Sequence, residues 1–231
     1  MNSIIHQIDL ACRVQERLTA FFGIPDWGDS RPPLDELVCT ILSQNTNDIN
    51  RDRAYTRLKG RFPTWEEVRD ANENDIVDAI RPAGLANQKG PRIQSILREI
   101  TQERGRLDLT FLEEMSTSEV ECWLTSFKGV GPKTAAIVLL FSLGKPAFPV
   151  DTHIYRVTGR LGLRPMKMTV EQAHVHLANL FPEDEYGPAH LNLIRLGREI
   201  CVARKPNCPV CPLQDICEFN QGRISDGSNK E

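Results

Sequence analysis

The segment Phe127-Lys-Gly-Val-Gly-Pro-Lys-Thr-Ala-Ala136 predicts a sharp turn between two helices. Its glycines allow a tight hairpin, and its proline suits the first turn of the helix that follows. The backbone N–H groups of Gly129, Val130 and Gly131 are then left uncovered at a helix N-terminus, where anions bind readily. The segment therefore predicts a phosphate-binding hairpin, with a plain corner between two packed helices as the alternative.

Helical patterning continues on both sides of this hairpin. Apolar residues recur at three-to-four spacing over 4–18 and 137–141, and strand alternation is nowhere sustained. Three pairs match the capping box, in which a hydroxyl and a carboxyl or amide satisfy the free amides of a helix start: Thr64 with Glu67, Ser116 with Glu119, and Thr169 with Gln172. We expect an all-α protein of about ten short helices.

Length and composition indicate a folded globular protein. The chain has 231 residues, 40% hydrophobic and 26% charged, and its net charge of −3 gives no wholesale attraction to polyanions. Its longest apolar run, 135–141, is less than half of the roughly 20 residues that a membrane span needs. The N-terminus lacks the basic-then-apolar order of a secretory signal. We therefore expect an intracellular, cytoplasmic protein with no membrane partner.

Four cysteines crowd into the C-terminal region with gaps of six, two and five residues: Cys201, Cys208, Cys211 and Cys217. Disulfides are disfavoured because intracellular thiols are kept reduced, so a metal centre is expected. Zinc sites usually present two close cysteine pairs, whereas here one pair is flanked by two single cysteines, and four thiolates also hold [4Fe–4S] clusters. Both centres stay open on this spacing. Between the first two cysteines, Arg204 and Lys205 are placed to meet a phosphate backbone.

Lys133 and Asp151 are the candidates for covalent and electrostatic chemistry. Lys133 follows the hairpin at the positive end of a helix, beside an apolar run, where the neutral, nucleophilic amine is favoured. Alternatively, it is one more phosphate clamp. Asp151 stands at a helix start, where capping is the ordinary explanation. Its second oxygen can still face a cavity and stabilise positive charge on a sugar, as in glycoside cleavage.

In this order, the motifs resemble those of the endonuclease III family of helix-hairpin-helix DNA glycosylases. The resemblance rests on the hairpin with Lys133, the Val-Asp-Thr-His-Ile segment with Asp151 and the cysteine spacing, and it covers most of the chain. It implies two α-helical lobes and a [4Fe–4S] cluster on the four cysteines. The expected layout is a helix at 1–25 that belongs to the cluster lobe, a six-helix lobe with the hairpin at 26–145, the rest of the cluster lobe at 146–221, and a disordered tail at 222–231.

The resemblance also implies roles for individual residues. Lys133 falls on the family's nucleophilic lysine and Asp151 on its catalytic aspartate. Leu85 matches the leucine that wedges against the base opposite the lesion. Another loop of the family supplies a side chain that fills the hole left by the flipped nucleotide. Here Asn45 stands at the usual glutamine position and Gln44 one place early, so which of the two fills the hole is open.

A bifunctional DNA glycosylase and lyase for abasic (AP) sites, acting in base excision repair, is what the resemblance implies. Such an enzyme would excise oxidised pyrimidines from double-stranded DNA and nick abasic sites by β-elimination through a Schiff base on Lys133. We expect a monomer whose partner is DNA with damaged bases or abasic sites, in the nucleoid if the source is bacterial or archaeal. Two alternatives stay open: a monofunctional glycosylase for alkylated or mismatched bases, and a non-catalytic DNA-damage-binding protein.

Overall fold

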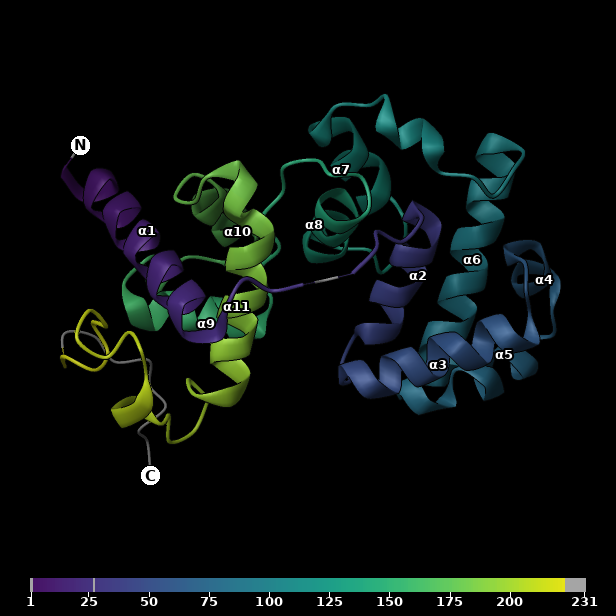
Figure 1. Cartoon of the computed structure of the whole chain (residues 1–231). Coiled ribbons are helices and arrows are strands. Elements are labelled where there is room, and N and C mark those ends of the chain that lie inside the picture. Colours follow the sequence, from purple (N-terminus) through teal and green to yellow (C-terminus); the bar gives the residue numbers. More distant parts are fainter. Residues whose placement is uncertain (1, 27, 223–231) are drawn as a thin grey trace. The chain divides into compact units, whose positions relative to one another are not determined.

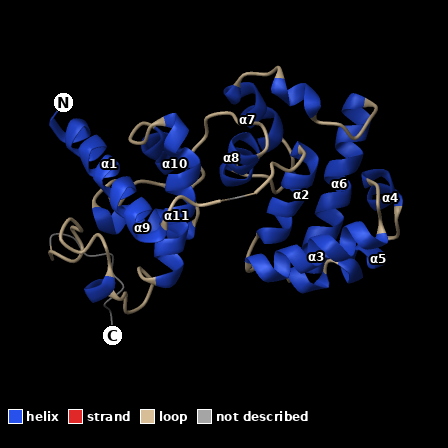
Figure 2. Cartoon of the chain, in the orientation of Figure 1, coloured by secondary structure: helices blue, strands red, loops and turns tan. Residues whose placement is uncertain are grey.

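Helices make up all the regular structure of the computed structural model, which describes residues 2–26 and 28–222 (Figure 2). No strand occurs in this part of the chain, so the predicted all-α fold is confirmed. The α-helices are α1 (Asn2–Phe22), α2 (Pro33–Ser43), α3 (Asp48–Arg61), α4 (Trp65–Asp70), α5 (Glu73–Ala79), α6 (Ala86–Arg104), α7 (Thr117–Thr125), α8 (Pro132–Phe141), α9 (Thr152–Leu161), α10 (Val170–Ala178) and α11 (Tyr186–Glu199). Short 3₁₀ turns lie at η1 (Arg81–Ala83), η2 (Thr110–Glu113), η3 (Glu183–Glu185) and η4 (Cys208–Val210).

The chain divides into two compact units (Figure 1). The continuous segment Ser30–Gly144 contains α2 to α8, and we call it the hairpin unit. The described residues of Met1–Asp29 and Lys145–Glu231 contain α1 and α9 to α11, and we call them the cysteine unit. Apart from Gly222, the tail at 222–231 for which disorder was predicted lies outside the described residues.

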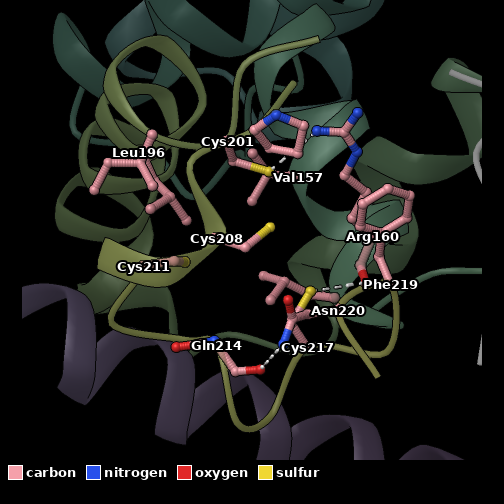
Figure 3. Close-up of a pocket in the computed structure, with 13 residues that line it drawn as sticks. Val157, Arg160, Leu196, Cys201, Cys208, Cys211, Gln214, Cys217, Phe219 and Asn220 are labelled. Atoms are coloured by element: carbon pink, nitrogen blue, oxygen red, sulfur yellow. Dashed lines mark hydrogen bonds between the residues drawn. The ribbon is translucent and has the colours of Figure 1, made fainter. Parts of the chain in front are cut away.

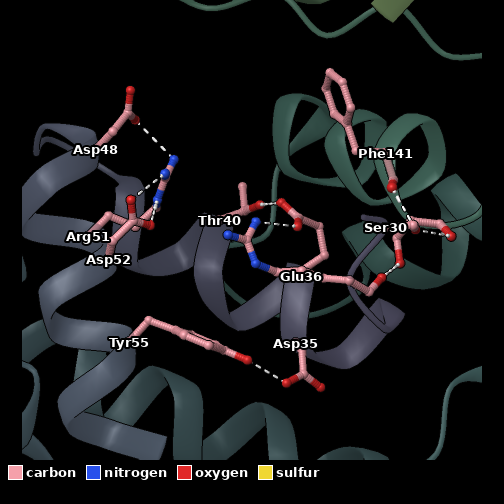
Figure 4. Close-up of polar contacts among 11 residues, drawn as sticks. Ser30, Asp35, Glu36, Thr40, Asp48, Arg51, Asp52, Tyr55 and Phe141 are labelled. Atoms are coloured by element: carbon pink, nitrogen blue, oxygen red, sulfur yellow. Dashed lines mark hydrogen bonds and ion pairs between the residues drawn. The ribbon is translucent and has the colours of Figure 1, made fainter. Parts of the chain in front are cut away.

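Helix α2 lies at the centre of the hairpin unit. Its side chains Leu37, Ile41 and Leu42 are fully buried, because α3, α6 and α8 pack against it. The Tyr55 hydroxyl on α3 donates a hydrogen bond to the Asp35 carboxylate on α2 (Figure 4). Hydrogen bonding thus adds a polar tie to the apolar contact between these two helices.

Both ends of the hairpin unit are fastened to each other. The Ser30 hydroxyl donates to the carbonyl of Phe141 at 2.9 Å and to that of Ser142 at 3.2 Å (Figure 4). In return, the Ser142 hydroxyl donates to the carbonyl of Arg31. The unit therefore begins and ends at the same place.

The cysteine unit is built on α9 and α11, with α1 packed against α11. The buried face of α1 is Leu10, Ala11, Val14 and Leu18. Gly197 lets α11 approach α9 closely, because a Cβ at this position would lie 2.9 Å from the Cβ of His153. None of the helices that the structure describes is long and apolar enough to span a bilayer.

The capping residues read from the sequence do begin helices. Ser116 and Thr169 each form a complete capping box, with Glu119 and Gln172 respectively. At Thr64 the structure shows the hydroxyl half, in which the Glu67 N–H donates to Thr64 Oγ1 at 3.2 Å. These local contacts define where α7, α10 and α4 start.

Candidate functional site

The predicted hairpin joins α7 to α8 in the hairpin unit. Gly129 has φ +86°, in the left-handed region that favours glycine. The Val130 N–H donates to the carbonyl of Phe127 at 3.0 Å, and the buried Val130 side chain fixes the turn to the core. Gly131 is the N-cap of α8, so the amides of the first helical turn lack intrahelical partners. The turn is confirmed, and its binding of phosphate stays a prediction.

Lys133 is the second residue of α8 and is half-buried. The next two residues of the helix, Thr134 and Ala135, are buried in the core. No hydrogen bond or ion pair joins the Lys133 ammonium group to another described residue. Because no described carboxylate or carbonyl occupies this amine, it is available to react with a ligand, as a nucleophilic lysine must be.

Asp151 is the N-cap of α9 in the cysteine unit. Its Oδ1 accepts a hydrogen bond from the Ile154 N–H at 2.8 Å, which is the capping contact expected from the sequence. The side chain is half-buried, and its Oδ2 has no hydrogen-bond partner within the described part of the chain. One oxygen therefore holds the helix start while the other stays available for chemistry.

Leu85, which the resemblance assigns to the duplex, and Asn45, one of the two candidates for filling the hole there, share an unusual backbone conformation. Asn45 has φ +53° and Leu85 has φ +49°, both in the left-handed region, where a residue with a Cβ is disfavoured by about 1–2 kcal/mol. Both side chains are exposed, Leu85 by 46%. A large apolar side chain held outward on a strained backbone fits a role in inserting into another molecule.

Gln44 differs from Asn45 in that both ends of its amide are engaged. Its Oε1 accepts a hydrogen bond from the Arg92 guanidinium at 2.9 Å, and its Nε2 donates to the carbonyl of Gly129 at 3.3 Å. Gln44 thus links α6 to the hairpin, whereas Asn45 projects into solvent.

Lys89 and Arg92 are two cations on α6 that the sequence reasoning missed. Lys89 is 1% exposed, and burial lowers the pKa of its amine to about 8, with Arg92 adding to the effect. Its Nζ donates to the carbonyls of Leu42 at 2.7 Å and Ala83 at 2.9 Å. The sequence shows Lys89 only as a lysine shortly after Leu85, and lysines are mostly exposed, so its burial could not be predicted.

The four cysteines line one cavity in the cysteine unit (Figure 3). The other lining side chains are mostly apolar, among them Val157, Leu161, Leu196, Ile200 and Phe219. Burial raises the pKa of the Cys211 thiol to about 11 and also raises the pKa of Cys217. Such thiols keep their protons at neutral pH unless a bound cation stabilises the thiolates.

The donor set fits a cluster better than a single ion. No group of three or more His, Cys, Asp or Glu side chains in the described ranges converges closely enough to hold one metal ion. Four thiols nevertheless share one largely apolar space. A zinc ion would need all four sulfurs at about 2.3 Å from a single point, whereas a [4Fe–4S] cluster takes one thiolate on each of four separate iron atoms.

Arg160, a further residue missed in the sequence, holds the start of the loop that carries Arg204 and Lys205. It is 1% exposed, and its guanidinium donates to the carbonyls of Val202 and Ala203, both at 2.8 Å. Arg204 and Lys205 follow directly and are exposed, with Lys205 at φ +54°. The buried arginine therefore fixes the base of a loop whose two cations are free to meet an anion.

Arg160 also contacts the cysteine cavity itself. Its guanidinium lies 3.5 Å from the Sγ of Cys201, and its carbonyl accepts hydrogen bonds from the Phe219 N–H at 3.0 Å and from the Cys217 thiol at 3.4 Å (Figure 3). One buried arginine thus contacts two of the four cysteines, Cys201 through its guanidinium and Cys217 through its carbonyl.

Two family models match the chain. The model of the HhH-GPD superfamily base excision DNA repair proteins matches residues 38–183, and that of the iron-sulfur binding domain of endonuclease III matches residues 201–217. The second match begins at the first of the four cysteines and ends at the last.

Individual proteins and structures agree with these matches. The protein named "Putative DNA glycosylase At3g47830", from Arabidopsis thaliana, is 44% identical over 65% of this chain and 52% of its own length, so the chain spans about half of that relative. Endonuclease III of Thermotoga maritima is 37% identical, over 83% of this chain and 85% of that protein. The "Structure of a Trapped Endonuclease III-DNA Covalent Intermediate: Estranged-Adenine Complex" superimposes with a TM-score of 0.76 at 26% identity, over 91% of this chain and 95% of that one.

Proposed function

This chain belongs to the HhH-GPD superfamily of base excision DNA repair proteins, and from that membership we propose that it excises oxidised pyrimidines from damaged double-stranded DNA and cuts the abasic product. It is a bifunctional DNA glycosylase and AP lyase that binds DNA, in line with its endonuclease III relatives and with the covalent DNA complex whose fold it shares. The observation that carries the proposal is Lys133, an amine at the start of the helix after the hairpin that forms no ion pair with any residue the structure describes.

The protein contains a [4Fe–4S] cluster, and Cys201, Cys208, Cys211 and Cys217 are the residues that would hold it. Bound there, the cluster would act as a structural centre that fastens the C-terminal loops. Arg160 supports it by donating toward Cys201 and by holding the loop of Arg204 and Lys205. Those two exposed cations would bind a DNA phosphate.

In the proposed reaction, the Lys133 amine attacks C1′ of the damaged nucleotide. The bond between C1′ and the base breaks, and the base leaves with its electron pair and takes up a proton. The Asp151 carboxylate stabilises the positive charge that develops on the sugar, using the oxygen that does not cap α9. The C1′–O4′ bond of the sugar ring then breaks, O4′ takes up a proton, and the Lys133 nitrogen forms a Schiff base with C1′. This Schiff base acidifies the C2′ proton, whose loss expels the 3′ phosphate and cuts the strand.

The target nucleotide must leave the duplex before Lys133 can reach its sugar, and unstacking costs a few kcal/mol. Asn45 and Leu85 would hold the distorted duplex open, Asn45 in the vacated space and Leu85 against the opposite base. Asn45 takes this role over Gln44, because the Gln44 amide already bonds Arg92 and Gly129. The amides of the hairpin at 129–131 would bind a phosphate beside the lesion.

Borohydride reduction tests the nucleophile. Incubation of the protein with an abasic duplex and borohydride should yield a covalent protein–DNA adduct, because reduction fixes the Schiff base. Lys133→Ala should give no adduct, while Lys167→Ala, at an exposed lysine of the cysteine unit, should give as much as the wild type. An undiminished adduct with Lys133→Ala would remove this residue from the mechanism.

Substrate range is tested with duplexes that carry one defined lesion. Thymine glycol should be released and the strand cut in the same reaction, whereas an alkylated purine should remain in place. Release of the base without strand cutting would select the monofunctional alternative, and binding without any product would select the non-catalytic one.

We also propose that the protein works as a monomer inside the cell, where its DNA lies, and size-exclusion chromatography with and without DNA tests the monomer.

A further inference from the structure

We propose that Lys89 is a positioning residue that ties together the two loops bearing Asn45 and Leu85 and so sets the spacing of the side chains that enter the duplex. The inference rests on the proposed function, because it concerns how that site meets DNA. Lys89 itself is 1% exposed, so it cannot reach a substrate and is not a second nucleophile.

Each of the two bonded carbonyls lies at the end of a helical element and has lost its usual partner. The Thr46 N–H, which would bond Leu42 O if α2 continued, bonds Ser43 O instead. Ala83 is the last residue of η1. Unpaired buried carbonyls are unfavourable, and the two N–H donors of a single amine satisfy both.

The bonded carbonyls stand just ahead of the exposed residues. Leu42 precedes Asn45 by three residues, and Ala83 precedes Leu85 by two. A left-handed conformation at a residue with a Cβ persists only where its surroundings enforce it. By fixing the chain immediately before both such residues, Lys89 supplies that constraint to the two loops at once.

The first turns of α6 reinforce the same arrangement. The backbone N–H of Lys89 donates to the carbonyl of Leu85 at 3.0 Å, so the residue holds the Leu85 turn by main chain and side chain alike. One turn further on, Arg92 bonds Gln44, the neighbour of Asn45. Loss of the Lys89 amine therefore frees both loops, whereas loss of a more distant contact on α6 does not.

The main variant is Lys89→Met, which keeps the length of the side chain and removes both hydrogen bonds. Gln94→Leu is the matched control, because Gln94 lies on the same helix, is equally buried and donates to the backbone carbonyls of Val68 and Ala71, both at 2.9 Å, away from the two loops. Thermal unfolding of both variants measures the general loss of stability that the two substitutions share.

Two substrates separate positioning from catalysis. On a single-stranded abasic oligonucleotide there is no opposite base to displace, so Lys89→Met should form the borohydride adduct as the wild type does. On a duplex with 2-aminopurine opposite a stable abasic analogue, Lys89→Met should bind at least about tenfold more weakly and lose the fluorescence rise that reports unstacking, since small misplacements have large effects. Gln94→Leu should behave as the wild type on both substrates.

If Lys89→Met and Gln94→Leu lost affinity for the duplex to the same extent, the proposal would be overturned. The proposal would also be overturned if adding Lys89→Met to the double variant Asn45→Ala, Leu85→Ala weakened duplex binding as much as it weakens the wild type. A positioning residue has no effect once the side chains that it positions are gone. If the methionine variant does not fold, Lys89→Gln, which keeps a shorter donor, is measured in its place. A wild type that forms no adduct on either substrate would refute the proposed function instead.

Discussion

Asp151 caps α9, and a single substitution can separate this contact from the catalytic role that we propose for its carboxylate. Asparagine caps helices about as well as aspartate but carries no charge, so Asp151→Asn should leave the start of α9 intact. We expect base excision under single-turnover conditions to slow by about 10²-fold, as when one preorganised electrostatic contact is removed, with an unchanged midpoint of thermal unfolding. Asp151→Ala should slow excision equally and also destabilise the protein by about 1 kcal/mol. Equal rates for Asp151→Asn and the wild type would mean that the carboxylate only caps.

The Lys89 amine predicts a specific dependence of stability on pH. Burial holds its pKa at about 8, below the ordinary value of 10.5, and Arg92 is the charged group that adds to this effect. Between these pH values the unfolded chain binds the extra proton and the folded chain does not, so the contribution of Lys89 to stability rises with pH. We expect urea unfolding at pH 7.5 and pH 10 to show that the free energy of unfolding of the wild type, relative to that of Lys89→Met, is larger at pH 10. If this difference in free energy of unfolding became smaller as the pH rises, the predicted direction would be wrong.

Residues whose role is local could be identified in the sequence, and residues whose role depends on tertiary contacts could not. The cysteine spacing, the Gly129 turn and the Asp151 cap each lie within one short segment. Lys89, by contrast, bonds a carbonyl 47 positions earlier, and Arg160 bonds one 42 positions later. Neither pairing leaves a periodic or spaced pattern in the chain, so burial of these two cations becomes visible only once the helices are packed.

The hairpin turn is a tightly constrained connection. Gly129→Ala would place a side chain on a left-handed backbone and a Cβ 2.4 Å from Arg92 Nε. We expect a loss of about 1–2 kcal/mol in the free energy of unfolding, and weaker duplex binding because Arg92 must leave Gln44. Gly60→Ala, in α3 with open space around it, should instead stabilise the protein by about 0.5–1 kcal/mol. Urea titrations of both variants measure whether the free energy of unfolding falls for Gly129→Ala and rises for Gly60→Ala.

Several helix starts could be predicted from the sequence. Ser116 and Thr169 begin helices because their hydroxyls bond amides three residues on, a contact that sequence alone specifies. The start of α6 could not be predicted in this way. Its N-cap is Leu85, which makes no side-chain cap and sits at φ +49°. That conformation depends on the packing around Lys89, so no propensity of leucine would reveal it.

At the scale of the molecule, removal of the iron should affect one unit and spare the other. The cluster cysteines lie in the cysteine unit, whereas the hairpin unit is a continuous segment with its own buried core. After oxidative loss of the cluster, hydrogen–deuterium exchange should rise over residues 201–222 and stay low in α2 and α8. Samples treated identically without oxidant serve as the control. Exchange that rises equally in α2 would show that the two units unfold together.

The split of the cysteine unit around Ser30–Gly144 has a consequence for protein synthesis. Domains fold as units while the chain leaves the ribosome, and the hairpin unit is complete once Gly144 has emerged, with Ser30 already bonded to Phe141. Helix α1 is translated before the hairpin unit, yet its face of Leu10, Val14 and Leu18 lacks its packing partner until α11 has been made. The hairpin unit can therefore finish folding on the nascent chain before α1 has the helix against which it packs.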